Sequence, residues 1–153
     1  MIRMALLISA LMYGMHYSPQ TAHAEAQHAH LYDNQEAQAD FIKGKIREYF
    51  PEDVAEAMIA VANCESTGLI HWRSDGTLIR NKPKKGKKAT SAKGVLQILF
   101  SLHRPDYTRL GLNMKDIDDY MRYGRHLYET QGPENAWKEC TVQMPKSVLA
   151  ALR

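Results

Sequence analysis

The 153-residue sequence lacks the motifs that identify several large classes of enzyme. It has no Gly-rich phosphate-binding loop, no serine on a recognisable nucleophile elbow and no internal repeat. Two histidines, His28 and His30, stand close together, but no second group of metal ligands accompanies them. We therefore expect no bound metal and no cofactor, and the candidate chemistry narrows to single side chains.

Long hydrophobic runs are also missing. The apolar run over residues 4–15 is much shorter than the ~20 residues that a helix needs to cross a bilayer. Arg3 precedes this run, and Ala22-His23-Ala24 closes it with the pattern of a signal-peptidase cleavage site. We predict a signal peptide at residues 1–24, and an exported protein, periplasmic or secreted, with no membrane span after cleavage.

Cysteine is scarce, with only Cys64 and Cys140 in the chain. An even number of cysteines in an exported protein favours one disulfide between them, and two buried thiols are the alternative. The composition, 44% hydrophobic and 24% charged, is that of one globular domain. The net charge of +3 is small and excludes no class of partner.

Hydrophobic periodicity predicts a mainly helical domain over residues 34–140. Residues 25–33 show no period and are expected to form a mobile N-terminus, and residues 141–153 form a tail without a pattern. We predict helices over residues 34–50, with Asp33 and Glu36 as a capping box, from Pro51 to a stop at Gly68, just past Gly94, over 115–131, and as a short turn at 134–140.

Two segments between the helices have other patterns. The segment from Trp72 to Ile79 contains an Asp-Gly turn signal and predicts a small, irregular β-hairpin. Residues 80–93 hold seven positive charges and no acid, and this composition predicts an exposed, flexible basic loop.

A charged residue interrupts the apolar stripe of the second helix. Val54, Met58 and Val61 form that stripe, and continuing it by one turn arrives at Glu65. Burial beside apolar side chains and the negative end of the helix dipole would both raise the pKa of this carboxyl group. Glu65 is therefore the candidate for proton transfer.

Four segments follow one another in a characteristic order: "NCESTG" at the expected helix end, "GVLQI", "YMRYGRHLY" and a closing "GPENAW". Together they resemble the lysozyme-like lytic transglycosylases, the murein-cleaving family with the SLT domain, over about residues 51–140. The resemblance implies a mainly α, lysozyme-like fold of several helices, in which a small β-hairpin or irregular loop region forms one wall of a saccharide cleft.

The family cleaves the β-1,4 bond between N-acetylmuramic acid and N-acetylglucosamine with one glutamic acid, which acts first as acid and then as base. Matched by motif, that residue is Glu65, and the products would carry 1,6-anhydromuramyl ends. A lysozyme-type muramidase would need a second carboxylate, and Asp75 is the candidate, although an Asp-Gly pair more often forms a turn. A non-catalytic wall-binding or assembly protein on the same fold is the remaining alternative.

The resemblance also implies substrate-binding residues, each with a structural alternative. Ser66 would bond near the reacting sugar or close the helix end, and Gln97 would bind an N-acetyl or hydroxyl group or lie exposed on a helix. Gly94 would let the backbone approach the saccharide. Tyr123 would stack on a sugar, and Trp72 would be either a sugar platform or a core residue.

Two features depart from the family pattern. No tyrosine precedes Asn135 where many members carry Tyr-Asn-Ala-Gly, which suggests a short, divergent branch. The Lys-rich loop at residues 80–93 is longer than in simple members, and it either attracts anionic wall polymers or serves as a solvated spacer. We expect a monomer whose partners are peptidoglycan glycan strands, and no nucleic acid, because aromatic residues do not alternate with the basic ones.

Overall fold

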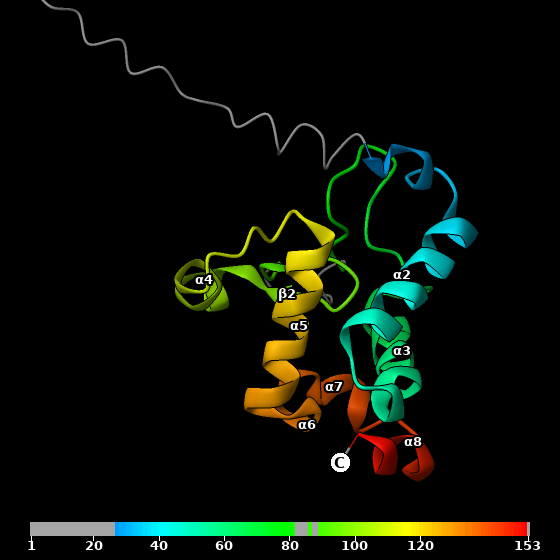
Figure 1. The fold of residues 1–153 in the computed structure, drawn as a ribbon, viewed down its shortest axis with the longest axis vertical. Coiled ribbons are helices and arrows are strands. Elements are labelled where there is room, and N and C mark those ends of the chain that lie inside the picture. Colours follow the sequence, from blue (N-terminus) through cyan, green and yellow to red (C-terminus); the bar gives the residue numbers. More distant parts are fainter. Residues whose placement is uncertain (1–26, 82–85, 87–88, 153) are drawn as a thin grey trace, which may run out of the picture.

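The computed structural model describes residues 27–81, 86 and 89–152, which fold into helices and one small sheet (Figure 1). The elements in chain order are η1 (Ala29–Leu31), α2 (Gln35–Tyr49), α3 (Glu52–Ser66), β1 (Ala92–Lys93), β2 (Ile98–Leu99), α4 (Phe100–Arg109), α5 (Ile117–Gln131), α6 (Pro133–Ala136), α7 (Lys138–Thr141) and α8 (Lys146–Ala151). The prediction of a mainly helical chain with a small β element is confirmed. The expected signal peptide and six residues of the basic loop lie outside the described residues.

Helix α2 packs against α3 and α5 through its apolar stripe. Ile42 and Ile46 are completely buried, as their helical spacing predicts. The N-cap is Asn34, whose side chain accepts a hydrogen bond from the amide of Ala37 at 3.0 Å. The predicted capping box of Asp33 and Glu36 is therefore wrong, because Asn34, one position later, is the N-cap and makes a single bond to the helix.

Helix α3 lies beside α2 (Figure 1) and also contacts α7 and α8. It begins after Pro51, which is the N-cap residue, and it ends at Ser66. Thr67 and Gly68 then take left-handed backbone angles, with φ of 53° and 105°. The side chain of Asn63 accepts a hydrogen bond from the amide of Gly68 at 3.2 Å, and this bond helps to close the helix.

The predicted hairpin is present as a short, irregular loop. Trp72 and Leu78 form an isolated antiparallel bridge, and the amide of Ile79 donates a hydrogen bond to the carbonyl of His71 at 2.9 Å. Within it, the amide of Arg73 donates to the carbonyl of Thr77. The two named strands, β1 and β2, lie farther along the chain and pair antiparallel, with Ala92 opposite Leu99 and Lys93 opposite Ile98.

The helix predicted just past Gly94 is wrong in its first residues. Residues 94–97 form a turn between β1 and β2, and the helix begins only at Phe100. The turn is favoured because side chains from other elements satisfy its backbone amides: Val95 donates to His71 Nδ1 at 3.1 Å, and Leu96 donates to the Tyr120 hydroxyl at 3.0 Å. Local periodicity cannot anticipate such distant partners.

Helix α5 begins after its N-cap residue, Asp116, whose carboxylate accepts hydrogen bonds from the amides of Asp118 and Asp119, both at 3.0 Å. Its buried face includes Tyr120 and Gly124. A side chain at Gly124 would meet Leu96 at 2.6 Å, so the glycine permits close packing of the turn onto this helix. The predicted end of the helix at Gly132 is confirmed.

The C-terminal helices return the chain to α3. The short helical turn predicted at residues 134–140 is present as α6 and α7. Between these helices Trp137 is buried, and its indole nitrogen donates a hydrogen bond to the Leu96 carbonyl at 2.9 Å. Cys140 forms a disulfide with Cys64 at the end of α3. The tail, which showed no pattern, forms α8 against α3 and buries Leu152.

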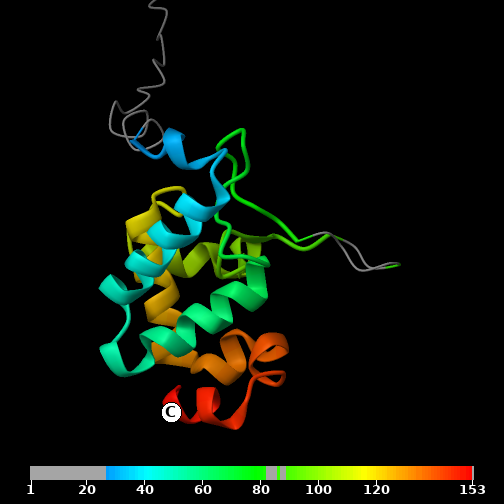
Figure 2. The same cartoon turned by 90° about the vertical axis from the view of Figure 1, so that its right-hand side faces the viewer.

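The segment before α2 is packed, in contrast to the mobile N-terminus that we expected. Leu31 in η1 is 4% exposed, and the ring of His28 stacks on Trp72 at 5.4 Å between centroids. Figures 1 and 2 place η1 at the opposite end of the molecule from α8. Hydrophobic periodicity could not predict this packing, because the segment has no amphipathic face. Single side chains, such as Leu31 and His28, attach it to the rest of the domain.

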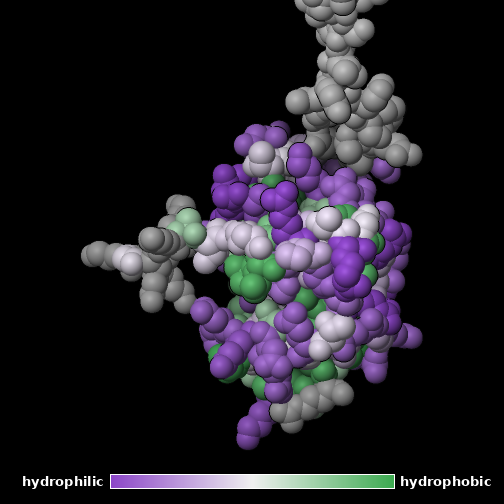
Figure 3. All heavy atoms as spheres, turned by 90° about the vertical axis from the view of Figure 1, so that its left-hand side faces the viewer, coloured by the Kyte–Doolittle hydropathy of each residue, from purple (hydrophilic) through white to green (hydrophobic). Residues whose placement is uncertain are grey.

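The outer surface of the described chain is predominantly hydrophilic. Figure 3 shows small hydrophobic patches separated by polar residues on the face that carries α4. The exposed large apolar residues are Leu102, Leu110 and Val142. In the described ranges, no helix combines the length and the apolar character required to span a membrane.

The disulfide gives the first testable prediction. Cys64 and Cys140 are 76 positions apart, so replacing both by alanine should lower the free energy of unfolding by about 4 kcal/mol, through the larger entropy of the open unfolded chain. Urea denaturation of the double variant and of the wild type measures this difference. The matched control is dithiothreitol, which should destabilise the wild type and leave the double variant unchanged; a wild type indifferent to reduction would contradict the prediction.

Candidate functional site

Glu65 lies in the last turn of α3 and is only partly exposed. The apolar stripe of this helix is buried, and it reaches Glu65 one turn after Val61. The loop that follows the hairpin contacts the same turn, because the side-chain amide of Asn81 donates a hydrogen bond to the Glu65 carbonyl oxygen at 2.7 Å. A carboxylic acid therefore stands where the helical layer meets the loops.

The protonation of Glu65 is shifted toward neutral pH. Burial raises the pKa of its carboxyl group from 4.5 to about 7, and the negative charge of Glu139 acts in the same direction. A carboxyl group with this pKa keeps its proton in about half of the molecules at neutral pH. It can therefore donate a proton to a substrate and afterwards accept one.

Glu139 is a neighbour that the sequence reasoning missed. The disulfide explains why it is near, since Cys64 precedes Glu65 and Cys140 follows Glu139. Glu139 itself is exposed in α7. The predicted pairing of the two cysteines was the signal that could have identified it, because the residues adjacent to a disulfide are brought close together.

Two of the predicted substrate-binding residues are buried and bonded within the protein. Ser66 is 2% exposed, and its hydroxyl donates a hydrogen bond to the Ala62 carbonyl at 2.8 Å, which is the local helix-end bond considered as its alternative. Tyr123 is completely buried, and its hydroxyl donates to Asp106 at 3.1 Å. Its ring packs beneath α4 and offers no face to a sugar, so the placement of Tyr123 in the cleft needs correction.

Gln97 connects two loops instead of lying exposed on a helix. Its amide nitrogen donates to the Gly94 carbonyl at 2.8 Å, and its amide oxygen accepts from the backbone amide of Asn81 at 3.2 Å. Since the side chain of Asn81 in turn bonds to Glu65, Gln97 positions the loop that touches the acid. The backbone φ of Gln97, 46°, fits the turn in which it lies.

Gly94 allows an unusually close approach between elements. Its φ is 72°, and a side chain there would lie 2.8 Å from the ring and hydroxyl of Tyr120 and 2.9 Å from the ring of His71. His71 is fully buried, and burial lowers its pKa to about 3, so the imidazole stays neutral at physiological pH. The close approach that we expected between backbone and saccharide is, in this structure, one between backbone and aromatic rings.

Trp72 is held on several sides and is 5% exposed. His28 stacks on one side, and the ring of His71 meets it edge-on at 4.5 Å. The buried side chain of Gln38, which the sequence reasoning did not identify, accepts hydrogen bonds from the amides of His71 and Trp72 at 2.5 and 2.7 Å. Trp72 thus belongs to the core, and it also lines a groove between the hairpin and the α4–α5 connection.

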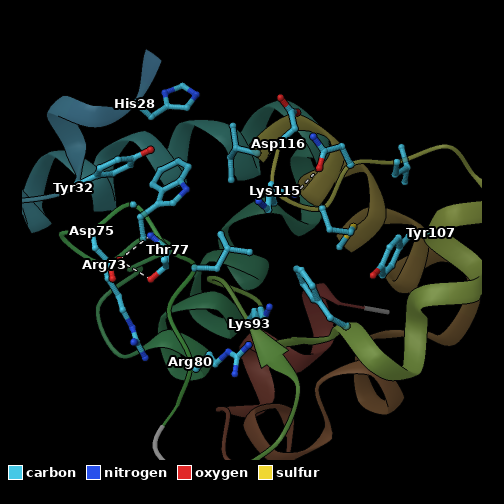
Figure 4. Close-up of a pocket in the computed structure, with 18 residues that line it drawn as sticks. His28, Tyr32, Arg73, Asp75, Thr77, Arg80, Lys93, Tyr107, Lys115 and Asp116 are labelled. Carbon is cyan, nitrogen blue, oxygen red and sulfur yellow. Dashed lines mark hydrogen bonds between the residues drawn. The ribbon is translucent and has the colours of Figure 1, made fainter. Parts of the chain in front are cut away.

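A groove with a volume of about 1000 Å³ lies between the hairpin and the α4–α5 connection (Figure 4). One side carries residues of η1 and the hairpin, and the other carries residues of α4 and of the segment before α5. Figure 4 places Lys93 and Arg80 together at one end. The aromatic residues that line the groove are His28, Tyr32, Trp72, Phe100 and Tyr107.

Glu65 does not line this groove but lies just past its basic end. Arg80 lines the groove, and the next residue, Asn81, bonds to Glu65. In β1, the carbonyl of Lys93 accepts a hydrogen bond from the Tyr120 hydroxyl at 2.8 Å. The negative charge of Glu65 helps to raise the pKa of the same hydroxyl. Asn81 and Tyr120 thus connect Glu65 with the part of the groove that carries Arg80 and Lys93.

Asp75 occupies the tip of the hairpin, away from Glu65. One carboxylate oxygen accepts hydrogen bonds from the amide and hydroxyl of Thr77 at 2.9 and 2.6 Å, and these bonds lower the pKa of Asp75. These bonds within its own turn agree with the turn-forming alternative for Asp75.

No group of three or more His, Cys, Asp or Glu side chains in the described ranges is arranged to hold a metal ion. Comparison with protein-family models, curated proteins and solved structures finds no match to this chain. The function must therefore be inferred from the geometry around Glu65 and the groove.

The close contact at Gly94 can be tested against a glycine with the same backbone angle. Gly94 and Gly111 both have φ of 72°, but a side chain at Gly111 would meet nothing within 4 Å. Each change to alanine should cost about 1 kcal/mol for the left-handed backbone, and Gly94→Ala should cost about 2 kcal/mol more through overlap with Tyr120 and His71. Chemical denaturation measures both values, and equal losses would contradict the packing described.

The raised pKa of Glu65 predicts a pH-dependent stability. Because the folded-state pKa, about 7, exceeds the ordinary 4.5, the contribution of this residue is fully present below 4.5 and is lost as the pH rises through 7. Glu65→Gln should therefore match the wild type near pH 4, and exceed it by about 2 kcal/mol near pH 8, since water reaches part of the side chain and weakens the effect.

Denaturation midpoints over that pH range test this prediction. The matched control is Glu52→Gln, which changes an exposed glutamate at the other end of the same helix and should not create the pH trend. Parallel stability curves for the wild type and the Glu65→Gln variant would show that Glu65 titrates as an ordinary exposed carboxylate.

Proposed function

We propose that this protein is a peptidoglycan lytic transglycosylase that cleaves the β-1,4 bond between N-acetylmuramic acid and N-acetylglucosamine. The observation that carries the proposal is a partly buried Glu65, with a pKa of about 7, whose backbone carbonyl is bonded to Asn81, the residue next to the groove-lining Arg80. Its place at the end of an apolar helix beside a hairpin wall is also what the resemblance to lysozyme-like enzymes implies. On this proposal the fold is a divergent, lysozyme-like one.

In the first step, protonated Glu65 transfers its proton to the glycosidic oxygen as the bond to the muramyl C1 breaks. The leaving N-acetylglucosamine departs with a free hydroxyl, and positive charge develops on the muramyl ring. Glu65 is then a carboxylate. Its high pKa favours this step, because the acid still holds a proton near neutral pH.

In the second step, the substrate completes its own cleavage. In the family, the N-acetyl group captures the cationic centre and the muramyl 6-hydroxyl displaces it. The C6–O–C1 bond forms, and the hydroxyl proton returns to Glu65, so no water is consumed. This route needs a single carboxylate, in agreement with the position of Asp75 at the hairpin tip and its bonds to Thr77.

The walls of the groove suit a saccharide chain. Aromatic rings, apolar side chains and polar groups all line it, and sugars present both apolar faces and hydroxyl groups. Gln97 and Asn81 act as positioning residues on this proposal, since they connect the turn at Gly94 to the backbone of Glu65. The predicted export would bring the protein to its wall substrate.

Hydrolysis by a muramidase route is the second candidate, and one observation favours it. Glu139 lies near enough to Glu65 for its charge to raise the pKa of the acid, so a second carboxylate is available to activate a water molecule. The two routes differ in their products. Transglycosylation gives anhydro ends, which are lighter by one water molecule than the reducing ends that hydrolysis gives.

The catalytic role of Glu65 predicts that Glu65→Gln reduces turbidity clearing of purified murein sacculi by at least about 100-fold, the usual contribution of general acid catalysis. The exposed Glu52→Gln change on the same helix is the control and should retain activity. Mass spectrometry of the wild-type products should find 1,6-anhydromuramyl ends. Reducing ends would replace the proposal by the muramidase, and full clearing by the Glu65→Gln variant would overturn both.

A further inference from the structure

Three basic side chains line the groove, and two of them, Arg80 and Lys93, lie together at one end. Arg80 comes from the end of the hairpin, Lys93 from β1 and Lys115 from the segment before α5, and all three line the groove (Figure 4). Lys93 is partly buried, and its amino group lies over the ring of Phe100 at 5.0 Å from the centroid. This contact with the Phe100 ring fixes the position of the positively charged amino group of Lys93.

The basic cluster is defined as Arg80, Lys93 and Lys115, and within the described ranges the carboxylates that line the groove form no ion pair with Arg80 or Lys93. Asp75 is bonded to Thr77 in its own turn, and Asp116 caps α5. Among the described residues, no acidic side chain forms an ion pair with Arg80 or Lys93. Three separate parts of the chain thus place cationic side chains in the groove, and two of these side chains, Arg80 and Lys93, form no ion pair within the described ranges.

The cations also act on one another. Burial lowers the pKa of Lys93, and the positive charges of Arg80 and Lys115 lower it further. Such mutual repulsion indicates a concentrated positive potential, which a bound anion would relieve. Because the flanking surface is aromatic, the site suits an anion attached to a larger, partly apolar molecule, more than a free inorganic ion.

We propose that the basic cluster binds carboxylates on the muramyl substituents of the glycan strand, so that the groove selects muramyl strands over neutral N-acetylglucosamine polymers. This inference rests on the proposed function, since it assumes that the strand in the groove leads to Glu65. A muramyl residue carries a carboxylate on its lactyl group, or several on the peptide stem attached there. Either source presents the same chemistry to an arginine and a lysine.

Binding is measured in the Glu65→Gln background, where cleavage does not consume the ligand. Three soluble ligands of equal saccharide length are compared by calorimetry: stem-bearing strands, strands stripped of stems by an amidase, and chito-oligosaccharides. The change Arg80→Gln with Lys93→Met should weaken binding of the carboxylate-bearing strands at least tenfold relative to chito-oligosaccharides. In the Glu65→Gln protein without further changes, a higher salt concentration should reduce the preference for carboxylate-bearing strands over chito-oligosaccharides.

The matched control is the pair Arg104→Gln with Lys146→Met, which removes the same charges from exposed positions on α4 and α8. The single change Lys93→Arg keeps the positive charge and should therefore keep the preference for carboxylate-bearing strands. This result would show that the weaker binding after Lys93→Met comes from the lost charge and not from loss of folding. A loss confined to stem-bearing strands assigns the stem carboxylates, a loss confined to stripped strands assigns the free lactyl carboxylate, and a loss for both shows that the cluster accepts either one.

Two results would overturn the inference: equal weakening for all three ligands, or no change for any of them. Its failure is separable from that of the proposed function. If the wild type releases no fragments from murein, the catalytic proposal fails, while the binding preference is still measured independently. If cleavage occurs but the double change leaves the preference intact, only the basic cluster has been misassigned.

Discussion

The hydroxyl group of Tyr120 is the contact on which the arrangement of the site depends. It donates a hydrogen bond to the Lys93 carbonyl and accepts one from the Leu96 amide, so a completely buried phenol on α5 holds both ends of the β1–β2 turn. Burial raises the pKa of this hydroxyl far above its ordinary value, which keeps it a donor at every physiological pH. The turn then orients Gln97, and Gln97 fixes the loop that contacts Glu65.

The acid itself is held at a cost to stability. Packing Glu65 at the end of an apolar helix disfavours its charged form, and this same effect provides a proton near neutral pH. Contacts elsewhere offset that cost, including the disulfide from Cys64 and the packing of α7 and α8 on α3. The helix that carries the acid is thus supported by a disulfide and by three other helices, in keeping with a site that needs rigid placement.

The sequence was sufficient for the parts of the fold in which local pattern and burial agree. The helices around Ile42, Met58 and Tyr120 have strong periodicity, and the disulfide follows from an even cysteine count. The segment after Gly94 could not be predicted, because its amides bond to side chains 24 positions away. Periodicity describes neighbours along the chain, whereas this turn is determined by His71 and Tyr120.

The same distinction applies to the candidate site. Glu65 was found because a charge on an apolar stripe is a local anomaly, and Glu139 was missed because the disulfide and the packing of α7 on α3, both distant in sequence, bring it near. Ser66 and Tyr123 match motif positions, but their hydroxyl groups bond within the protein. A motif identifies the type of residue at a position, and burial decides whether that residue is available to a ligand.

The bond between Cys64 and Cys140 makes the placement of Glu65 sensitive to the redox conditions around the protein. Disulfides form and persist in oxidising compartments, and thiols stay reduced in the cytosol. In a reducing compartment the end of α3 would be joined to α7 by non-covalent contacts alone, and Glu139 would no longer be tethered beside the acid. The covalent link therefore couples the chemical environment of the chain to the geometry of its proton donor.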